Sequence, residues 1–170
     1  ALIETTWLSD LEDQSLMDYD LQLENYIKNN LGIKNYKINF TERGAIPLFH
    51  PLIKNNKKTV YIGSAGGMTR LSTGYTFLNI QEHSKYIVEN IDKIEKIKMY
   101  NIGKKYQFLD KIFLRVLKNN PDKMPKIFFE MFKASSSCVI KFLSNKSNIF
   151  EDINIIRRMP KLIFMRALFH

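Results

Sequence analysis

The chain has 170 residues, an apolar share of 45% and a net charge of +9, which together exclude an intrinsically disordered protein. Its single cysteine, Cys138, excludes an intrachain disulfide and suits a reducing compartment. With one cysteine and three scattered histidines the chain makes a poor metal site, and no apolar run approaches the ~18 residues of a spanning helix. We also expect no secretory leader.

The first part of the chain is expected to contain strands and one helix. Residues 1–8 are rich in β-branched and aromatic side chains and predict a strand. Apolar residues then recur at helical spacing from Ser15, the expected N-cap, to Gly32, the expected stop. Residues 36–41 alternate between apolar and polar and predict a half-buried strand, and residues 59–62 predict a short one.

After the glycine cluster at residues 63–67 the pattern becomes helical. Apolar residues recur there with the spacing of an amphipathic helix. Asn120-Pro121 indicates a new helix start, because proline is well tolerated in a first turn. The expected helices cover residues 72–98, 104–118, 136–144, 149–156 and 159–169.

Charge is unevenly distributed along the chain. Residues 1–100 hold 12 basic and 12 acidic side chains, whereas residues 101–170 hold 14 basic and five acidic ones, together with nine of the 12 Phe. We therefore expect two domains, 1–100 and a helical basic region, 101–170. The second region predicts a partner that is both negative and apolar, or a covered surface.

A strand followed by glycines and a helix is an arrangement that can hold a phosphate. Glycine allows close approach of the backbone, and a helix N-terminus presents free N–H groups to an anion. Here Gly66, Gly67 and Gly74 supply the flexibility, and Arg70 could supply a cation. A Gly-Gly turn before a helix also occurs as plain loop chemistry.

The run Gly63-Ser64-Ala65-Gly66-Gly67-Met68-Thr69-Arg70-Leu71-Ser72-Thr73-Gly74-Tyr75 resembles the C-terminal flavin-contact segment of lycopene cyclases. Two earlier motifs of that family, E-x-T and E-x-G-x-I-P, are similar to Glu4-Thr5-Thr6 and Glu42-Arg43-Gly44-Ala45-Ile46-Pro47. The helical tail also resembles the family's C-terminus, so the resemblance covers essentially the whole chain.

The resemblance implies an α+β fragment of an α/β FAD-binding fold, with N-terminal strands and a helix followed by a helical C-terminal region. It implies reduced FAD as cofactor, NAD(P)H as electron source, and flavin contacts from Gly63, Ala65, Gly66, Gly67, Met68, Thr69, Ser72, Thr73 and Gly74. Two departures matter: Ser64 stands where related flavoenzymes carry an Asp, and no G-x-G-x-x-G is present. We therefore expect the C-terminal part of a longer enzyme, which alone is inactive and binds FAD poorly.

Closing a ring on a linear carotenoid such as lycopene is an isomerisation, performed by an intramolecular lyase that begins with protonation of a terminal double bond. A carboxyl group buried among apolar side chains can hold that proton. Glu4, within an apolar strand and matching the Glu of E-x-T, is the candidate acid, and Glu42 is the second candidate. Alternatively, Glu4 faces solvent or pairs with Arg43 or Arg70, and Glu42 pairs with Arg43.

Carotenoids dissolve in lipid, so the basic tail predicts peripheral attachment to an anionic membrane, at its cytoplasmic face. A helical cap with a solvated basic face is the alternative, and no nucleic-acid signature appears. Other functions that fit are a polyprenyl reductase or hydroxylase using FAD, or a non-catalytic peripheral membrane module. The candidate cations are Lys104, Lys105, Lys111, Arg115, Lys118, Lys126, Lys133, Arg157, Arg158, Lys161 and Arg166.

Overall fold

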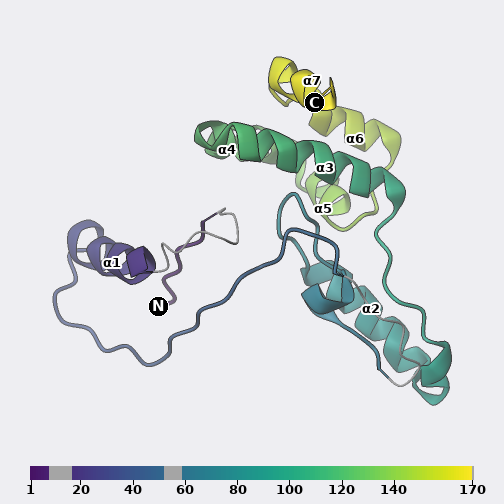
Figure 1. Cartoon of the computed structure of the whole chain (residues 1–170), viewed down its shortest axis with the longest axis horizontal. Helices are drawn as coiled ribbons and strands as arrows, with labels where there is room; N and C mark the ends of the chain where they lie inside the picture. Colours follow the sequence, from purple (N-terminus) through teal and green to yellow (C-terminus); the bar gives the residue numbers. More distant parts are fainter. Residues whose placement is uncertain (8–16, 52–58, 170) are drawn as a thin grey trace. The chain divides into compact units, whose positions relative to one another are not determined.

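The computed structural model describes residues 1–7, 17–51 and 59–169 and separates the chain into two compact units. The first unit is Ala1–Gly44 and the second is Ala45–His170. Figure 1 shows the elements of both units in chain order.

The first unit is built around a single helix. Helix α1, Met17–Asn25, begins with acidic residues in its first turn, which suit the positive end of a helix, and continues as the π-helical turn η1, Tyr26–Asn30. The N-terminal segment is attached to it, because the ring of Trp7 packs 4.7 Å from that of Tyr19. The indole Nε1 of Trp7 also donates a hydrogen bond to Gln22 Oε1 at 3.0 Å.

Before α3 (Lys104–Asn119), the described part of the second unit contains one α-helix and two 3-10 segments. A 3-10 turn, η2, covers Gly63–Gly66, and helix α2 covers Phe77–Glu89. The 3-10 segment η3, Ile91–Lys96, follows α2 after a break at Asn90.

The helical body of the second unit consists of five α-helices. Contacts between their residues join α3 to α7, α4 to α5 and α5 to α6 (Figure 1). Helix α6 begins with a capping box, in which Asn148 and Glu151 exchange hydrogen bonds between side chain and backbone. The elements are α3 (Lys104–Asn119), η4 (Pro121–Lys123), α4 (Met124–Phe132), α5 (Ser136–Leu143), α6 (Ile149–Ile156) and α7 (Lys161–Phe169).

The core lies among these five helices. Phe113 of α3 is at its centre, with its ring 5.5 Å from that of Phe128 in α4 and 5.7 Å from that of Phe164 in α7. Most of the buried apolar residues come from positions spaced three or four apart, as the helical pattern predicted. They include Val116, Leu117, Ile127, Met131, Val139, Phe142, Leu143, Ile155 and Met159.

The expected α+β fold is wrong for the described residues, none of which forms a β-strand. Residues 1–7, 36–41 and 59–62, which predicted strands, find no neighbouring strand within the described part of the chain. The alternating side chains of residues 36–41 are not covered, and Ile38 and Phe40 are 67% and 72% exposed. In residues 1–7 and 59–62 alternation leaves some side chains half-buried without a strand forming. A strand depends on a partner for its backbone hydrogen bonds, and the period-2 pattern does not supply one.

Most helix predictions are confirmed, with changed ends. Gly32 has a φ of +66°, as expected of a residue that terminates a helix, while the predicted cap Ser15 lies outside the described residues. The long helix expected from Ser72 is wrong at its start, because residues 72–76 belong to a turn and α2 begins only at Phe77. The division at residue 100 stays a prediction. Among the described residues, no helix is both long and apolar enough to cross a bilayer.

Candidate functional site

The candidate flavin loop, called here the glycine loop, runs from Gly63 to Tyr75. Its first part is closed by Gly67, which has a left-handed φ of +72° and donates its N–H to the Ser64 carbonyl at 3.1 Å. Gly66 is required by packing, since a Cβ there would lie 2.5 Å from the Tyr61 carbonyl oxygen. Both glycines thus meet a demand of the backbone itself.

The second part of the glycine loop is a turn from Arg70 to Tyr75. The Arg70 N–H donates to the Tyr75 carbonyl at 2.9 Å, and the Gly74 N–H donates to the Arg70 carbonyl at 2.8 Å. Gly74 has a φ of +70°, and nothing lies within 4 Å of the position of an added Cβ. This end of the loop therefore combines a glycine-specific backbone with open space.

Arg70 connects the glycine loop to helix α3. Its side chain is fully buried, at 0% exposure, and its Nη2 and Nε lie 2.6 and 2.9 Å from the two oxygens of Asp110, itself only 1% exposed. Arg70 also donates to the Phe142 carbonyl, and its guanidinium lies 4.8 Å and 4.9 Å from the rings of Tyr106 and Phe142. The expectation that Arg70 supplies a cation to a ligand is wrong, because this charge is already neutralised by Asp110.

Asp110 also fixes the backbone of the glycine loop. Its Oδ2 accepts from the Leu71 N–H at 3.1 Å, and its Oδ1 accepts from the Ser72 hydroxyl at 2.6 Å. The carboxylate is therefore bound by two side chains and one backbone donor, which offsets the cost of burying it.

The predicted flavin-contact residues fall into two groups. Met68, Thr69 and Ser72 are buried together with Gly66, with Met68 fully inaccessible. The remaining five lie on the accessible side of the glycine loop. They are Gly63, Ala65, Gly67, Thr73 and Gly74.

A buried polar cluster supports the glycine loop from α2. Asn79 donates its side-chain N–H to the Met68 carbonyl at 2.8 Å, and Asn145 donates to Asn79 Oδ1 at 3.3 Å and to the Tyr100 hydroxyl at 3.1 Å. The His83 ring packs edge-on against Tyr100 with 5.7 Å between centroids. Burial without a partner for its Nε2 lowers the pKa of His83 below 6.5.

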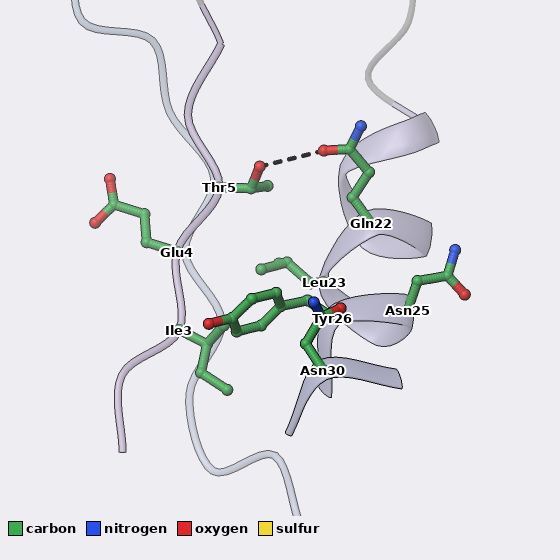
Figure 2. Close-up of a pocket in the computed structure, with 8 residues that line it drawn as sticks. All are labelled: Ile3, Glu4, Thr5, Gln22, Leu23, Asn25, Tyr26 and Asn30. Atoms are coloured by element: carbon green, nitrogen blue, oxygen red, sulfur yellow. Dashed lines mark hydrogen bonds between the residues drawn. The ribbon is translucent and has the colours of Figure 1, made fainter. Parts of the chain in front are cut away.

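Glu4 lies in the first unit, beside a pocket of about 340 Å³. Helix α1 and residues 3–5 line this pocket, and Thr5 lies within hydrogen-bond distance of Gln22 at 3.4 Å. Figure 2 shows the Glu4 carboxylate turned away from α1, and the side chain is exposed. Its Oε1 accepts a 2.8 Å hydrogen bond from the Thr6 hydroxyl, so Glu4 pairs with neither of the two expected arginines.

Glu42 and Arg43, at the start of the predicted bend, belong to the same unit as Glu4. Glu42 is exposed, and Arg43 forms an ion pair with Asp20 of α1 instead of pairing with Glu42. The E-x-T segment and the bend are therefore both attached to α1, through Gln22 and Asp20.

Comparison with known families decides the relationship of this chain. The family model described as "Lycopene cyclase protein" matches residues 1–169. The chain belongs to the lycopene cyclase family. No curated protein and no solved structure matches it significantly.

The glycine loop of this lycopene cyclase family member meets the chemical needs of a flavin in part. The first N–H groups of a 3-10 turn have no partner inside it, so the start of η2 offers the N–H groups of Gly63 and Ser64 as donors. Gly74 adds space for close approach. Arg70 and Ser72 are unsuited, because Asp110 already binds both. The fit is thus to the accessible side of the loop only.

The sequence analysis missed Asp110, Asn79, Asn145 and Tyr100. Asp110 carried a usable signal, since it stands on the same helical face as the buried Tyr106, Phe113 and Leu117. A carboxylate on an apolar helix face needs a cation or hydrogen-bond donors to be buried there, so such a position predicts a charged or polar partner.

Replacing Asp110 by Asn should strongly destabilise the second unit, because the Arg70 cation would stay buried without a counter-charge. We expect a loss of about 3–5 kcal/mol in the free energy of unfolding, measured by urea titration with circular dichroism. Glu82→Gln is the control, since it breaks a half-exposed pair with Lys146 and should cost less than about 1 kcal/mol. Equal, small effects of both substitutions would contradict the anchoring role of Asp110.

His83 should make stability depend on pH. Because its folded pKa lies below the ordinary 6.5, the unfolded chain takes up a proton first as the pH falls. Its contribution is fully present above 6.5 and is lost as the pH falls toward the folded pKa. Urea titrations at several pH values should show a smaller fall for His83→Gln than for the wild type, and an unchanged fall for His50→Gln, at an exposed position. An identical fall in all three proteins would exclude His83 as the cause.

Proposed function

We propose that the chain is the C-terminal part of an FAD-dependent lycopene cyclase that closes a ring at the end of a linear carotenoid. The family match over residues 1–169 carries this proposal. Attachment of both acidic motifs to α1 supports it, because it brings the two candidate carboxylates into one unit.

In the proposed reaction the Glu4 carboxyl transfers its proton to a carbon of the terminal double bond. The carbocation that results is captured by a neighbouring double bond, which forms the ring bond. A proton then passes from a ring carbon to a carboxylate, that of Glu4 or Glu42, which leaves a new double bond in the ring. No electrons are gained or lost overall, so the product has the mass of the substrate. Because Glu4 is exposed in its unit, this role requires the substrate or another segment of the protein to cover it.

Glu42 is assigned a positioning role at the bend. It is exposed and takes no part in the Arg43–Asp20 pair, so its side chain is available to orient a ligand or to favour a nearby carbocation.

Reduced FAD, kept reduced by NAD(P)H, would supply an electron-rich ring that favours a positive charge on the substrate. Gly63, Ala65, Thr73 and Gly74 would hold it through backbone contacts on the accessible side of the glycine loop. The missing G-x-G-x-x-G would be contributed by another part of the intact protein, so the chain alone should be inactive.

The same proposal places the protein at the cytoplasmic face of a membrane as a peripheral protein. Its support is the chemistry of the substrate, since a linear carotenoid is dissolved in lipid. The single buried cysteine is consistent with a reducing compartment.

Glu4→Gln should abolish ring formation by the intact protein in cells that accumulate lycopene. Loss of a general acid lowers a rate by about 10²–10⁴-fold, so cyclic carotenoids should fall below detection at equal protein level. Chromatography with mass spectrometry measures the products, and Glu24→Gln, which removes an exposed carboxylate paired with Lys28, is the control.

Three outcomes of this experiment would contradict the proposal. Unchanged ring products with Glu4→Gln would remove Glu4 from the mechanism. A product of altered mass would indicate a reductase or hydroxylase. Absence of any carotenoid product from the wild-type intact protein would favour a non-catalytic membrane module.

Ala65→Trp should lower the flavin content of the intact protein. Ala65 is exposed at the start of η2, so an indole there blocks approach to the backbone without disturbing the core. Flavin absorbance per mole of purified protein should drop at least about tenfold, while Ser137→Trp, at an exposed position of α5, should leave it unchanged. Full flavin content in the Ala65→Trp protein would exclude this side of the loop.

A further inference from the structure

The outer side of α6 and α7 carries an unusual amount of exposed apolar surface. Phe150 and Phe169 are 79% and 83% exposed, although both belong to helices whose other face joins the core. The other exposed apolar residues of the two helices are Ile149, Ile153, Ile156, Leu162, Met165 and Leu168. Isolated exposed apolar residues are normal, whereas this many on two consecutive helices indicate a surface that is covered in use.

Three of these residues in each helix form a stripe, and Phe150 and Leu168 lie beside the stripes. In α6, Ile149, Ile153 and Ile156 are spaced four and three apart, so they share one face. In α7, Leu162, Met165 and Phe169 are spaced three and four apart in the same way. The opposite faces hold Ile155 and Ala167, which are buried.

The same two helices carry an excess of free cations. Their acidic residues, Glu151 and Asp152, are paired with Lys141 and Lys105. Residues 153–169 hold no acidic side chain, and their cations are Arg157, Arg158, Lys161 and Arg166. All four are exposed, and no ion pair joins them to another residue of the described chain. Cations beside exposed Phe and Leu match the two layers of a bilayer surface, its anionic headgroups and its acyl chains.

Other candidate cations of the basic tail are engaged within the protein. Lys105 binds Asp152 at 2.6 Å, Arg115 donates to the Ala167 carbonyl at 2.7 Å, and Lys133 binds Glu130 at 2.8 Å. Lys133 lies beside the exposed Phe129 of α4 and is paired with Glu130, while the exposed Lys126 of α4 has no ion pair within the described residues. The apolar face of α4 therefore has one free cation on its helix, against four in the segment of α6 and α7.

We propose that the α6–α7 surface, made of the exposed apolar residues above with Arg157, Arg158, Lys161 and Arg166, docks the protein onto an anionic phospholipid membrane. The inference deepens the proposed function by naming the surface that reaches the lipid phase. It rests on that function only for the reason to be at a membrane, because the docking chemistry belongs to these two helices.

The test measures binding of the purified full chain to vesicles of phosphatidylcholine with and without phosphatidylglycerol, by co-sedimentation. The wild type should bind the anionic vesicles, bind neutral ones far more weakly, and be released by added salt. Each cation near an anionic surface contributes about fivefold in affinity, so Arg157→Gln with Arg158→Gln should lose about 25-fold. Phe150→Ser with Phe169→Ser should lose at least about tenfold.

Matched controls carry the same changes elsewhere. Lys93→Gln with Lys96→Gln removes two exposed charges from η3, and Phe129→Ser with Phe132→Ser removes two exposed rings from α4. Both should bind within about twofold of the wild type. Circular dichroism checks that the variants keep their helices, and Ile153→Ser with Leu162→Ser replaces the Phe pair if it does not fold.

Equal binding by the α6–α7 variants and the wild type would overturn the proposal, as would equal losses in the controls. A wild type that binds neutral vesicles as well as anionic ones would also overturn it, since the cations would then contribute nothing. So would a wild type that binds no vesicles at all, since the surface would then suit a protein partner. Because no catalytic step is involved, these results are independent of whether Glu4→Gln abolishes ring products.

Discussion

The structure of the second unit depends on the contact between Arg70 and Asp110. Neither charge could remain in the apolar interior alone, because the desolvation of each costs several kcal/mol. Here the guanidinium meets a carboxylate, a carbonyl and two aromatic faces, while the carboxylate also binds Leu71 N–H and the Ser72 hydroxyl. One buried pair therefore determines both the shape of the glycine loop and its position on the helical body.

The buried and the accessible residues of the glycine loop have different roles. The buried residues, such as Met68 and Thr69, hold the loop in place, and Asn79 of α2 donates a hydrogen bond to the Met68 carbonyl. The accessible positions Gly63, Ala65, Gly67 and Gly74 carry little or no side chain, so they present mainly backbone, while Thr73 and Tyr75 are partly accessible as well. A surface of this kind recognises a ligand by shape and by N–H groups, with specificity set by neighbouring parts of the protein.

How far the sequence predicts this structure depends on how local each feature is. Helices α3 to α7 follow from a period of 3.6 residues, a proline at Pro121 and caps such as Asn148, all of which act within a few residues. The strands expected at 1–8, 36–41 and 59–62 failed because a strand requires a distant partner, which alternation alone does not reveal. The special backbone of the glycine loop follows from its glycines, as the positive φ of Gly67 and Gly74 shows, and its flavin contacts stay a prediction. The buried role of Arg70 could not be predicted, since Asp110 lies 40 positions away.

Gly66 has a consequence for recognising relatives of this protein. Its missing side chain avoids the Tyr61 carbonyl oxygen, 2.5 Å from where a Cβ would stand, and this need arises whether or not a cofactor is bound. A relative with no cofactor and no activity would still be selected to keep glycine at this position. Glycine there is evidence of a shared fold, and evidence of retained activity has to come from residues that the backbone does not itself require.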